Sequence, residues 1–97
     1  MEKEEIIRLI VAHGMEETLD ICMEECSELS KAITKLKRSM RSGSRIAVKK
    51  CRKDLVEECA DVIICIKILC ELYNIPEKEL YTTIYNKMEL NLARIGV

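Results

Sequence analysis

DLVEECADVIICIKILCELY, residues 54–73, is the most informative stretch of this 97-residue chain. Placed on a helix, it carries two stripes whose members recur every three or four residues, the spacing at which helical side chains share a face. The stripe from Leu55 to Tyr73 is apolar, and the stripe from Asp54 to Leu72 combines acidic with apolar residues. A helix that is apolar on most sides is buried on more than one of them. In a chain this short, we expect a second subunit to cover one face.

The rest of the chain divides into helices around that stretch. We expect helices over residues 2–13, 15–38, 45–73 and 76–94. Gly14 and the Ser- and Gly-rich segment 39–44 are typical helix stops, Ser44 is a candidate N-cap, and Pro76 suits a first helical turn. The sequence therefore predicts an all-α fold. The protomer should resemble a four-helix bundle, with a short N-terminal helix, a long antiparallel helix pair and a C-terminal helix. We expect one domain over residues 1–97, completed by oligomerisation.

Apolar spacing also predicts which helix faces point inward. In the second helix the expected core stripe is Cys22, Cys26, Leu29, Ile33 and Leu36. Glu25 and Glu28 should flank that stripe, whereas Glu24, Lys31 and Lys35 should share a solvated face. In the fourth helix, Leu80, Ile84 and Met88 should face the core.

The composition excludes several classes of protein. Three Tyr, no Trp, no Phe, three Gly and one Pro favour helices over a sheet. We reject a secreted disulfide framework for the six cysteines, because the N-terminus is charged and most cysteines lie within apolar helical stripes. The sequence contains no Cys-x-x-Cys pair, so the spacing of its cysteines does not indicate a zinc site. No apolar run reaches the roughly 20 residues of a membrane span. We therefore expect a cytoplasmic protein with reduced cysteines and no membrane association.

Basic residues are concentrated in one part of the chain, although the formal net charge is only −1. No acidic residue lies between Leu29 and Asp54, and this interval contains ten of the sixteen Lys and Arg residues. We interpret it first as a solvated helical hairpin. Attraction of a triphosphate is the second interpretation, and contact with nucleic acid is the third.

Two acidic pairs provide the candidate chemistry. Glu25 and Glu28, like Glu58 and Asp61, are three residues apart and so share a helix face. On adjacent antiparallel helices, these four carboxylates would gather around one point, where unpaired charges would be costly. A hard divalent cation resolves that cost, so the sequence predicts Mg²⁺, with Mn²⁺ as the alternative. A di-iron site would need Glu-x-x-His motifs, and the single histidine, His13, lies outside both clusters.

A polar stripe near the C-terminus supplies candidate substrate contacts. Lys87, Asn91 and Arg94 follow one another at helical spacing. Next to a metal that binds phosphate, the two cations would neutralise phosphate charge, and Asn91 would donate a hydrogen bond to sugar or phosphate. Considered alone, the stripe is more typical of a solvated helix face.

Taken in order, these motifs resemble those of the MazG-like nucleotide pyrophosphohydrolases, in the all-α NTP pyrophosphatase superfamily. The resemblance covers residues 16–94 and rests on the two acidic pairs, each preceded by a further Glu, and on the segment from Lys87 to Arg94. It implies hydrolysis of a nucleoside triphosphate between the α and β phosphates. It further implies that Glu25, Glu28, Glu58 and Asp61 are catalytic Mg²⁺ ligands. Lys87, Asn91 and Arg94 would bind substrate in a homodimer or homotetramer.

Two other functions compete with this interpretation. One is a non-catalytic helical module that binds a nucleotide or a protein on the same scaffold, because no aromatic residue lies within residues 1–72 to stack on a base. The other is a small nucleic-acid binder that uses the basic hairpin. We rank nucleic acid last among the partners, because only one segment of the chain favours it.

Overall fold

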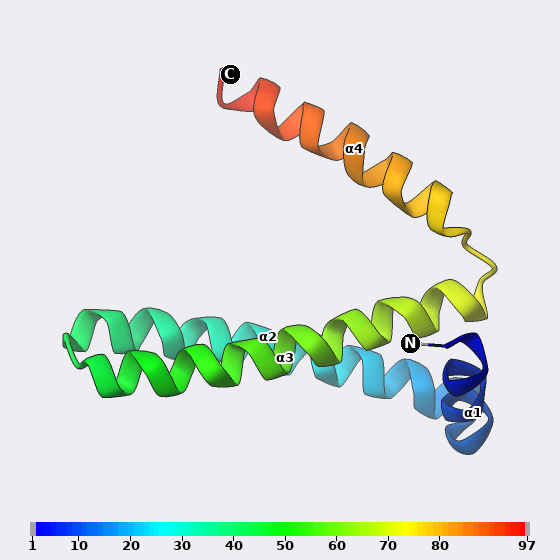
Figure 1. Cartoon of the computed structure of the whole chain (residues 1–97), viewed down its shortest axis with the longest axis horizontal. Coiled ribbons are helices and arrows are strands. Elements are labelled where there is room, and N and C mark those ends of the chain that lie inside the picture. The colour runs from blue at the N-terminus through cyan, green and yellow to red at the C-terminus, as the bar shows by residue number, and fades with distance from the viewer. Residues whose placement is uncertain (1, 97) are drawn as a thin grey trace.

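The computed structural model describes residues 2–96, which form four α-helices and no strand. In chain order they are α1 (Lys3–His13), α2 (Met15–Ser42), α3 (Arg45–Leu72) and α4 (Glu77–Arg94). Figure 1 shows α2 and α3 lying side by side as an antiparallel pair, with α1 packed at one end of the pair. The all-α fold, with a short N-terminal helix, a long helix pair and a C-terminal helix, is confirmed.

The hairpin formed by α2 and α3 sets the length of the molecule. Each helix has 28 residues, which at about 1.5 Å per residue corresponds to roughly 42 Å. The longest dimension of the chain is 44 Å. α2 continues to Ser42, four residues beyond its predicted end, because the hydroxyls of Ser39 and Ser42 donate to carbonyls one turn earlier instead of ending the helix. Gly43 then ends α2 with a left-handed φ of 72°.

The predicted cap of the next helix is present. The Oγ atom of Ser44 accepts a hydrogen bond from the Ala47 amide at 3.2 Å. This bond satisfies one of the amides that a helix N-terminus leaves without an internal partner. Ser44 therefore fixes where α3 begins, directly after the turn at Gly43.

The seam between α2 and α3 runs closer to the acidic residues than predicted. Cys22 and Ala32 are buried and Glu25 is half-buried, whereas Cys26 is exposed and Ile33 is 46% exposed. The expected core stripe is therefore wrong at Cys26 and Ile33. The predicted stripe holds at Cys22, which is buried, and at Leu29 and Leu36, which are half-buried. The other buried residues of α2 are small or polar, namely Thr18, Ala32 and Ser39. The contact between α2 and α3 therefore includes an acidic residue, Glu25.

On α3, the mixed stripe is the one that faces α2. Asp54, Glu58 and Asp61 on this stripe are partly buried, and Cys65 and Ile68 are buried. The helix pair consequently encloses carboxylates from both of its members. The apolar stripe of α3 lies further from the seam.

Helix α4 leaves the end of α3 and points away from the hairpin (Figure 1). It has no buried residue and makes no extended packing contact with the other helices. The prediction that Ile84 and Met88 face a core is wrong within one chain, since they are 45% and 51% exposed. The turn accounts for this direction, because Asn74 adopts a left-handed φ of 52° and Pro76 caps α4 with extended backbone.

In the described part of the chain, none of the helices offers an apolar stretch that could cross a bilayer.

Candidate functional site

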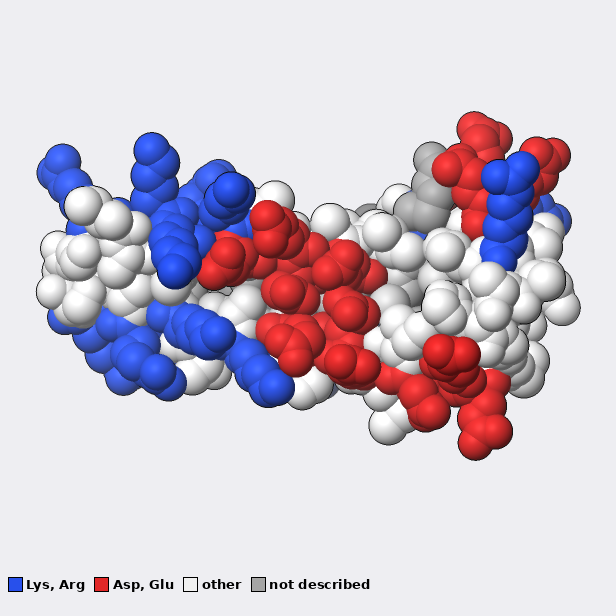
Figure 2. Space-filling view, turned by 90° about the horizontal axis from the view of Figure 1, so that it is seen from below, with Lys and Arg blue, Asp and Glu red and all other residues white. Residues whose placement is uncertain are grey.

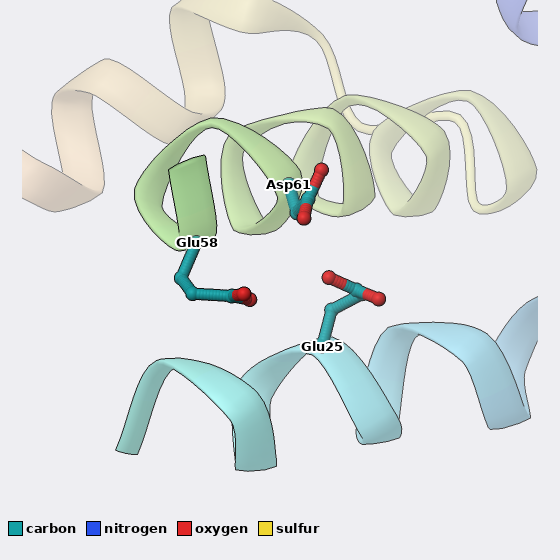
Figure 3. Close-up of side chains that lie close together, drawn as sticks. All are labelled: Glu25, Glu58 and Asp61. Carbon is teal, nitrogen blue, oxygen red and sulfur yellow. The ribbon is translucent and has the colours of Figure 1, made fainter. Parts of the chain in front are cut away.

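Three of the four predicted carboxylates converge between α2 and α3. Glu25 projects from α2, Glu58 and Asp61 project from α3, and their carboxylates point toward one another (Figure 3). One oxygen from each lies within 4.8 Å of the others. Glu58 and Asp61 meet because they are one helical turn apart, and Glu25 joins them because the antiparallel pairing places the middle of α2 opposite the middle of α3. We call these three residues the acidic triad.

The environment of the acidic triad favours neutralisation of its charge. Burial raises the pKa of Glu25, and the adjacent carboxylates of Asp61 and Glu58 raise it further. Burial likewise raises the pKa of Glu58, followed by repulsion from Asp61 and Glu28. Partial loss of solvent and like charges act in the same direction, because both disfavour a second negative charge at the same place. A cation at this point would reverse both effects.

One oxygen of the acidic triad lacks a hydrogen-bond donor. Oε2 of Glu58 is buried and has no hydrogen-bond partner in residues 2–96. A buried carboxylate oxygen without a donor is costly, and such groups call for an explanation such as a bound ion. Oxygen donors from three carboxylates are the ligand type of Mg²⁺ and Mn²⁺. The residues present therefore fit a hard divalent cation.

Glu28, the fourth predicted ligand, does not join the acidic triad. Its Oε1 atom lies 3.2 Å from Nζ of Lys31, one turn further along α2. Glu28 is nevertheless close enough to raise the pKa of Glu58 by repulsion. Its place is therefore beside the triad and paired with a lysine. Its predicted roles as metal ligand and catalytic residue stay predictions.

The predicted substrate contacts on α4 lie apart from the acidic triad within one chain. Lys87, Asn91 and Arg94 are exposed, and a hydrogen bond of 3.5 Å links Nη1 of Arg94 to Oδ1 of Asn91. None of them lines the cavities next to the triad. Their shared helix face agrees with the prediction, and their role toward a substrate stays a prediction.

Two cavities flank the acidic triad along the α2–α3 seam. The first, of about 170 Å³, is mostly apolar and includes Ile21, Ile64 and Ile68 together with Glu25 and Asp61. The second, of about 120 Å³, is polar and lies on the other side. Its charged lining consists of Glu28, Lys31, Lys35, Asp54, Glu57 and Glu58. We call them the apolar cavity and the polar cavity; the triad separates them.

A buried hydroxyl belongs to the wall of the apolar cavity. Thr18 is 3% exposed, and its Oγ1 atom has no hydrogen-bond partner among the described residues. His13, at the same cavity, has its Nδ1 atom 3.5 Å from a carboxylate oxygen of Glu17. Thr18 was not among the predicted site residues, because a lone threonine in a helix gives no signal without its neighbours on other helices.

Charge is segregated along the hairpin. Figure 2 shows basic side chains around the tip formed by the α2–α3 turn and acidic side chains over the middle of the pair. Lys31 and Lys35 lie where these two regions meet, since both line the polar cavity with Glu58. Apolar spacing predicts a solvated face for these lysines. Their ammonium groups are exposed, as predicted, but they also border the site. The spacing of Lys31 three residues after Glu28 was the available signal.

Comparison of the chain with protein family models, curated proteins and solved structures finds no match.

Proposed function

We propose that this protein is a Mg²⁺-dependent nucleoside triphosphate pyrophosphohydrolase, which converts an NTP or dNTP into the monophosphate and pyrophosphate. The observation that carries the proposal is the convergence of Glu25, Glu58 and Asp61 around a buried oxygen without a donor. The order of the acidic and basic motifs, which resembles that of MazG-like enzymes, supports the same activity. Mn²⁺ is the alternative cation, because it prefers the same oxygen ligands.

The residues of the site suit water-driven cleavage of a phosphoanhydride. A bound divalent cation would neutralise phosphate charge and make a water molecule more acidic. Glu25, Glu58 and Asp61 would hold that cation, and Glu28, beside them, would take a proton from the attacking water. The water oxygen forms a bond to the α phosphorus. The bond from that phosphorus to the bridging oxygen breaks, and pyrophosphate leaves with the electron pair.

The apolar cavity supports a nucleoside as the neighbouring group. It adjoins Glu25 and Asp61, so a ring bound there would place its phosphates near the triad. A dry cavity of about 150 Å³ can hold a benzene-sized ring, and this one measures about 170 Å³. Its aliphatic walls would contact the base, and the imidazole of His13 is the aromatic ring in its lining.

A homodimer or homotetramer is part of the proposal. An 18-residue helix gains most of its stability from packing, and α4 exposes several large apolar side chains, among them Tyr81, Ile84 and Met88. A second copy of the chain would cover this face. It would also give Lys87, Asn91 and Arg94 access to the phosphates of a substrate. The six free cysteines fit a reducing, cytoplasmic compartment.

A nucleotide panel with Mg²⁺ tests the activity. We expect pyrophosphate release from at least one NTP or dNTP, and loss of at least about a hundredfold in Glu58→Gln or Asp61→Asn, since each removes a charged ligand. Glu24→Gln is the matched control, because it removes the same charge from an exposed neighbour on α2. Activity that survives Glu58→Gln and Asp61→Asn would refute the assigned site.

A non-catalytic nucleotide-binding module is the second candidate, favoured by the absence of Phe, Tyr and Trp among the described residues that line the apolar cavity. It predicts that nucleotides bind with Mg²⁺ without turnover. Calorimetry on the same nucleotide panel distinguishes it from the enzyme.

A further inference from the structure

Two lysines stand at the border of the acidic triad on the side opposite the apolar cavity. Lys31 and Lys35 are one turn apart on α2 and line the polar cavity together with Glu58. Side chains at positions i and i+4 of a helix are neighbours, so two ammonium groups face the same space. Along the seam, the order is therefore apolar cavity, acidic triad and lysine pair.

The current partner of Lys31 is a weak one. Its ammonium group lies 3.2 Å from Glu28, with side-chain exposures of 63% and 42%. Exposed pairs of this kind contribute little stability. Lys35 makes no ion pair with any residue in 2–96. Both lysines are thus available to a stronger anion at small cost to the fold.

The charge of the polar cavity limits which anion it can accept. Four carboxylates line it, from Glu28, Asp54, Glu57 and Glu58, against two ammonium groups. That excess of two negative charges, to which Glu25 and Asp61 of the triad add two more, repels a free anion. A divalent cation held by the triad would cancel half of the excess, so an anion that arrives with such a cation is repelled less. Phosphate oxygens bound to Mg²⁺ have this property.

We propose that Lys31 and Lys35 bind the β and γ phosphates of the metal-bound triphosphate and hold the pyrophosphate as it leaves. This inference rests on the proposed function, and it assigns the phosphate tail to the side of the triad opposite the nucleoside. On binding, Lys31 exchanges Glu28 for a phosphate oxygen, which frees Glu28 beside the triad. The lysine pair acts within one chain, in addition to the stripe on α4.

Binding of inorganic pyrophosphate tests the lysine pair directly. Calorimetry measures pyrophosphate with and without Mg²⁺, and Mg²⁺ alone, on the full chain. In wild type, we expect pyrophosphate to bind only with Mg²⁺. Lys31→Gln and Lys35→Gln should each weaken that binding about tenfold or more, as expected for a lost hydrogen bond to a charged group. Affinity for Mg²⁺ alone should not fall in either variant.

Lys37→Gln is the matched control, because it removes the same charge from an exposed position of α2 that lines neither cavity. Its pyrophosphate affinity should stay within about twofold of wild type. An equal loss in all three variants would overturn the proposal in favour of general electrostatic attraction. So would unchanged binding in Lys31→Gln and Lys35→Gln, or no binding of pyrophosphate to wild type with Mg²⁺.

Steady-state kinetics separates this inference from the proposed function. If the protein hydrolyses nucleotides, Lys31→Gln and Lys35→Gln should raise KM for the triphosphate more than they lower kcat, and Lys37→Gln should change neither. Hydrolysis with an unchanged KM in both lysine variants would overturn the lysine subsite alone. Lysine-dependent binding of Mg²⁺ and pyrophosphate, without hydrolysis of any nucleotide, would overturn the enzymatic proposal and keep the subsite.

Discussion

In the metal-free protein, the surroundings of Glu58 disfavour the charged form of its carboxylate. Burial and neighbouring acids raise the pKa of Glu58 from 4.5, so the folded protein holds this proton more tightly than the unfolded chain. The corresponding stability is fully present below the unfolded pKa and is lost as the pH rises through the folded one. At neutral pH, the metal-free protein therefore bears an unrelieved repulsion between Glu58 and Asp61.

Glu58→Gln should raise the melting temperature of the metal-free protein at neutral pH, because it removes that repulsion. The same variant should lose stabilisation by Mg²⁺, which in wild type grows with the ratio of free ion to Kd. Thermal unfolding in EDTA and in Mg²⁺ measures both, with Glu24→Gln as the control. A lower melting temperature in EDTA would contradict this account of Glu58.

Cys65 shows what burial does to a thiol at the end of the apolar cavity. Burial raises the pKa of Cys65 to about 12, and the adjacent Cys22 contributes to the shift. The thiolate is the reactive form, so Cys65 is inert at neutral pH, whereas Cys26 and Cys59 are exposed.

Alkylation of the native protein at pH 7.5 should therefore modify Cys26 and Cys59 first. In the native state, Cys22 and Cys65 should react at least about a hundredfold more slowly than Cys26 and Cys59, because burial limits access and thiolate formation. Unfolding should remove this difference. Mass spectrometry of timed samples gives the order. Early modification of Cys65 would show that the cavity opens on the timescale of the reaction.

Among the elements, the α2–α3 turn depends on one hydroxyl and one glycine. Ser44→Ala removes the N-cap of α3 and should lower the free energy of unfolding by about 1 kcal/mol. Urea denaturation monitored by circular dichroism measures the change. Ser44→Thr is the control, since threonine retains a capping oxygen. Equal loss in both variants would indicate that the packing of the turn, and not the cap, sets its stability.

The helix ends could be predicted where the residues at the end itself determine the backbone conformation or the cap. Gly14, Gly43, Ser44 and Pro76 mark helix ends through backbone and capping preferences, so the helix boundaries were predictable within a few residues. The end of α2 was the exception, because serines near a C-terminus can either end a helix or bond back to its carbonyls.

The candidate site was predictable in part for the same reason. Glu58 and Asp61 are three residues apart on one helix, so their spacing in the sequence is enough to predict that they lie close together. Glu25 required the register of α2 against α3, which was inferred from the antiparallel pairing. Glu28 could turn either toward the triad or toward Lys31, and in the structure it pairs with Lys31. Residue spacing alone does not decide between these two partners.

For the whole molecule, the position of α4 was the least predictable feature. Its amphipathic pattern predicts that one face is covered, but it does not identify the helix or subunit that covers this face. Ile84 and Met88 are exposed in the single chain, and our proposal assigns the covering of this face to a second copy. Their apolar spacing predicted a core position, because this spacing is the same for a core within one chain and for a core shared by two chains.

Ile84→Glu should convert the proposed oligomer into a monomer, because it places a charge in the centre of the apolar face of α4. Sedimentation should give wild type a mass at least twice the 11.2 kDa of the chain, and Ile84→Glu a mass near that value. Thr82→Glu introduces the same charge at an exposed position on the other side of α4 and should leave the mass unchanged. A monomeric wild type would refute the oligomer.

The claim on which everything else depends is that Glu25, Glu58 and Asp61 hold a divalent cation between α2 and α3. Anomalous diffraction from a crystal grown with Mn²⁺ would locate the ion. We expect one strong peak bonded to an oxygen of each of these three carboxylates. A peak only at other residues, or three carboxylates that turn toward solvent with no ion between them, would contradict it.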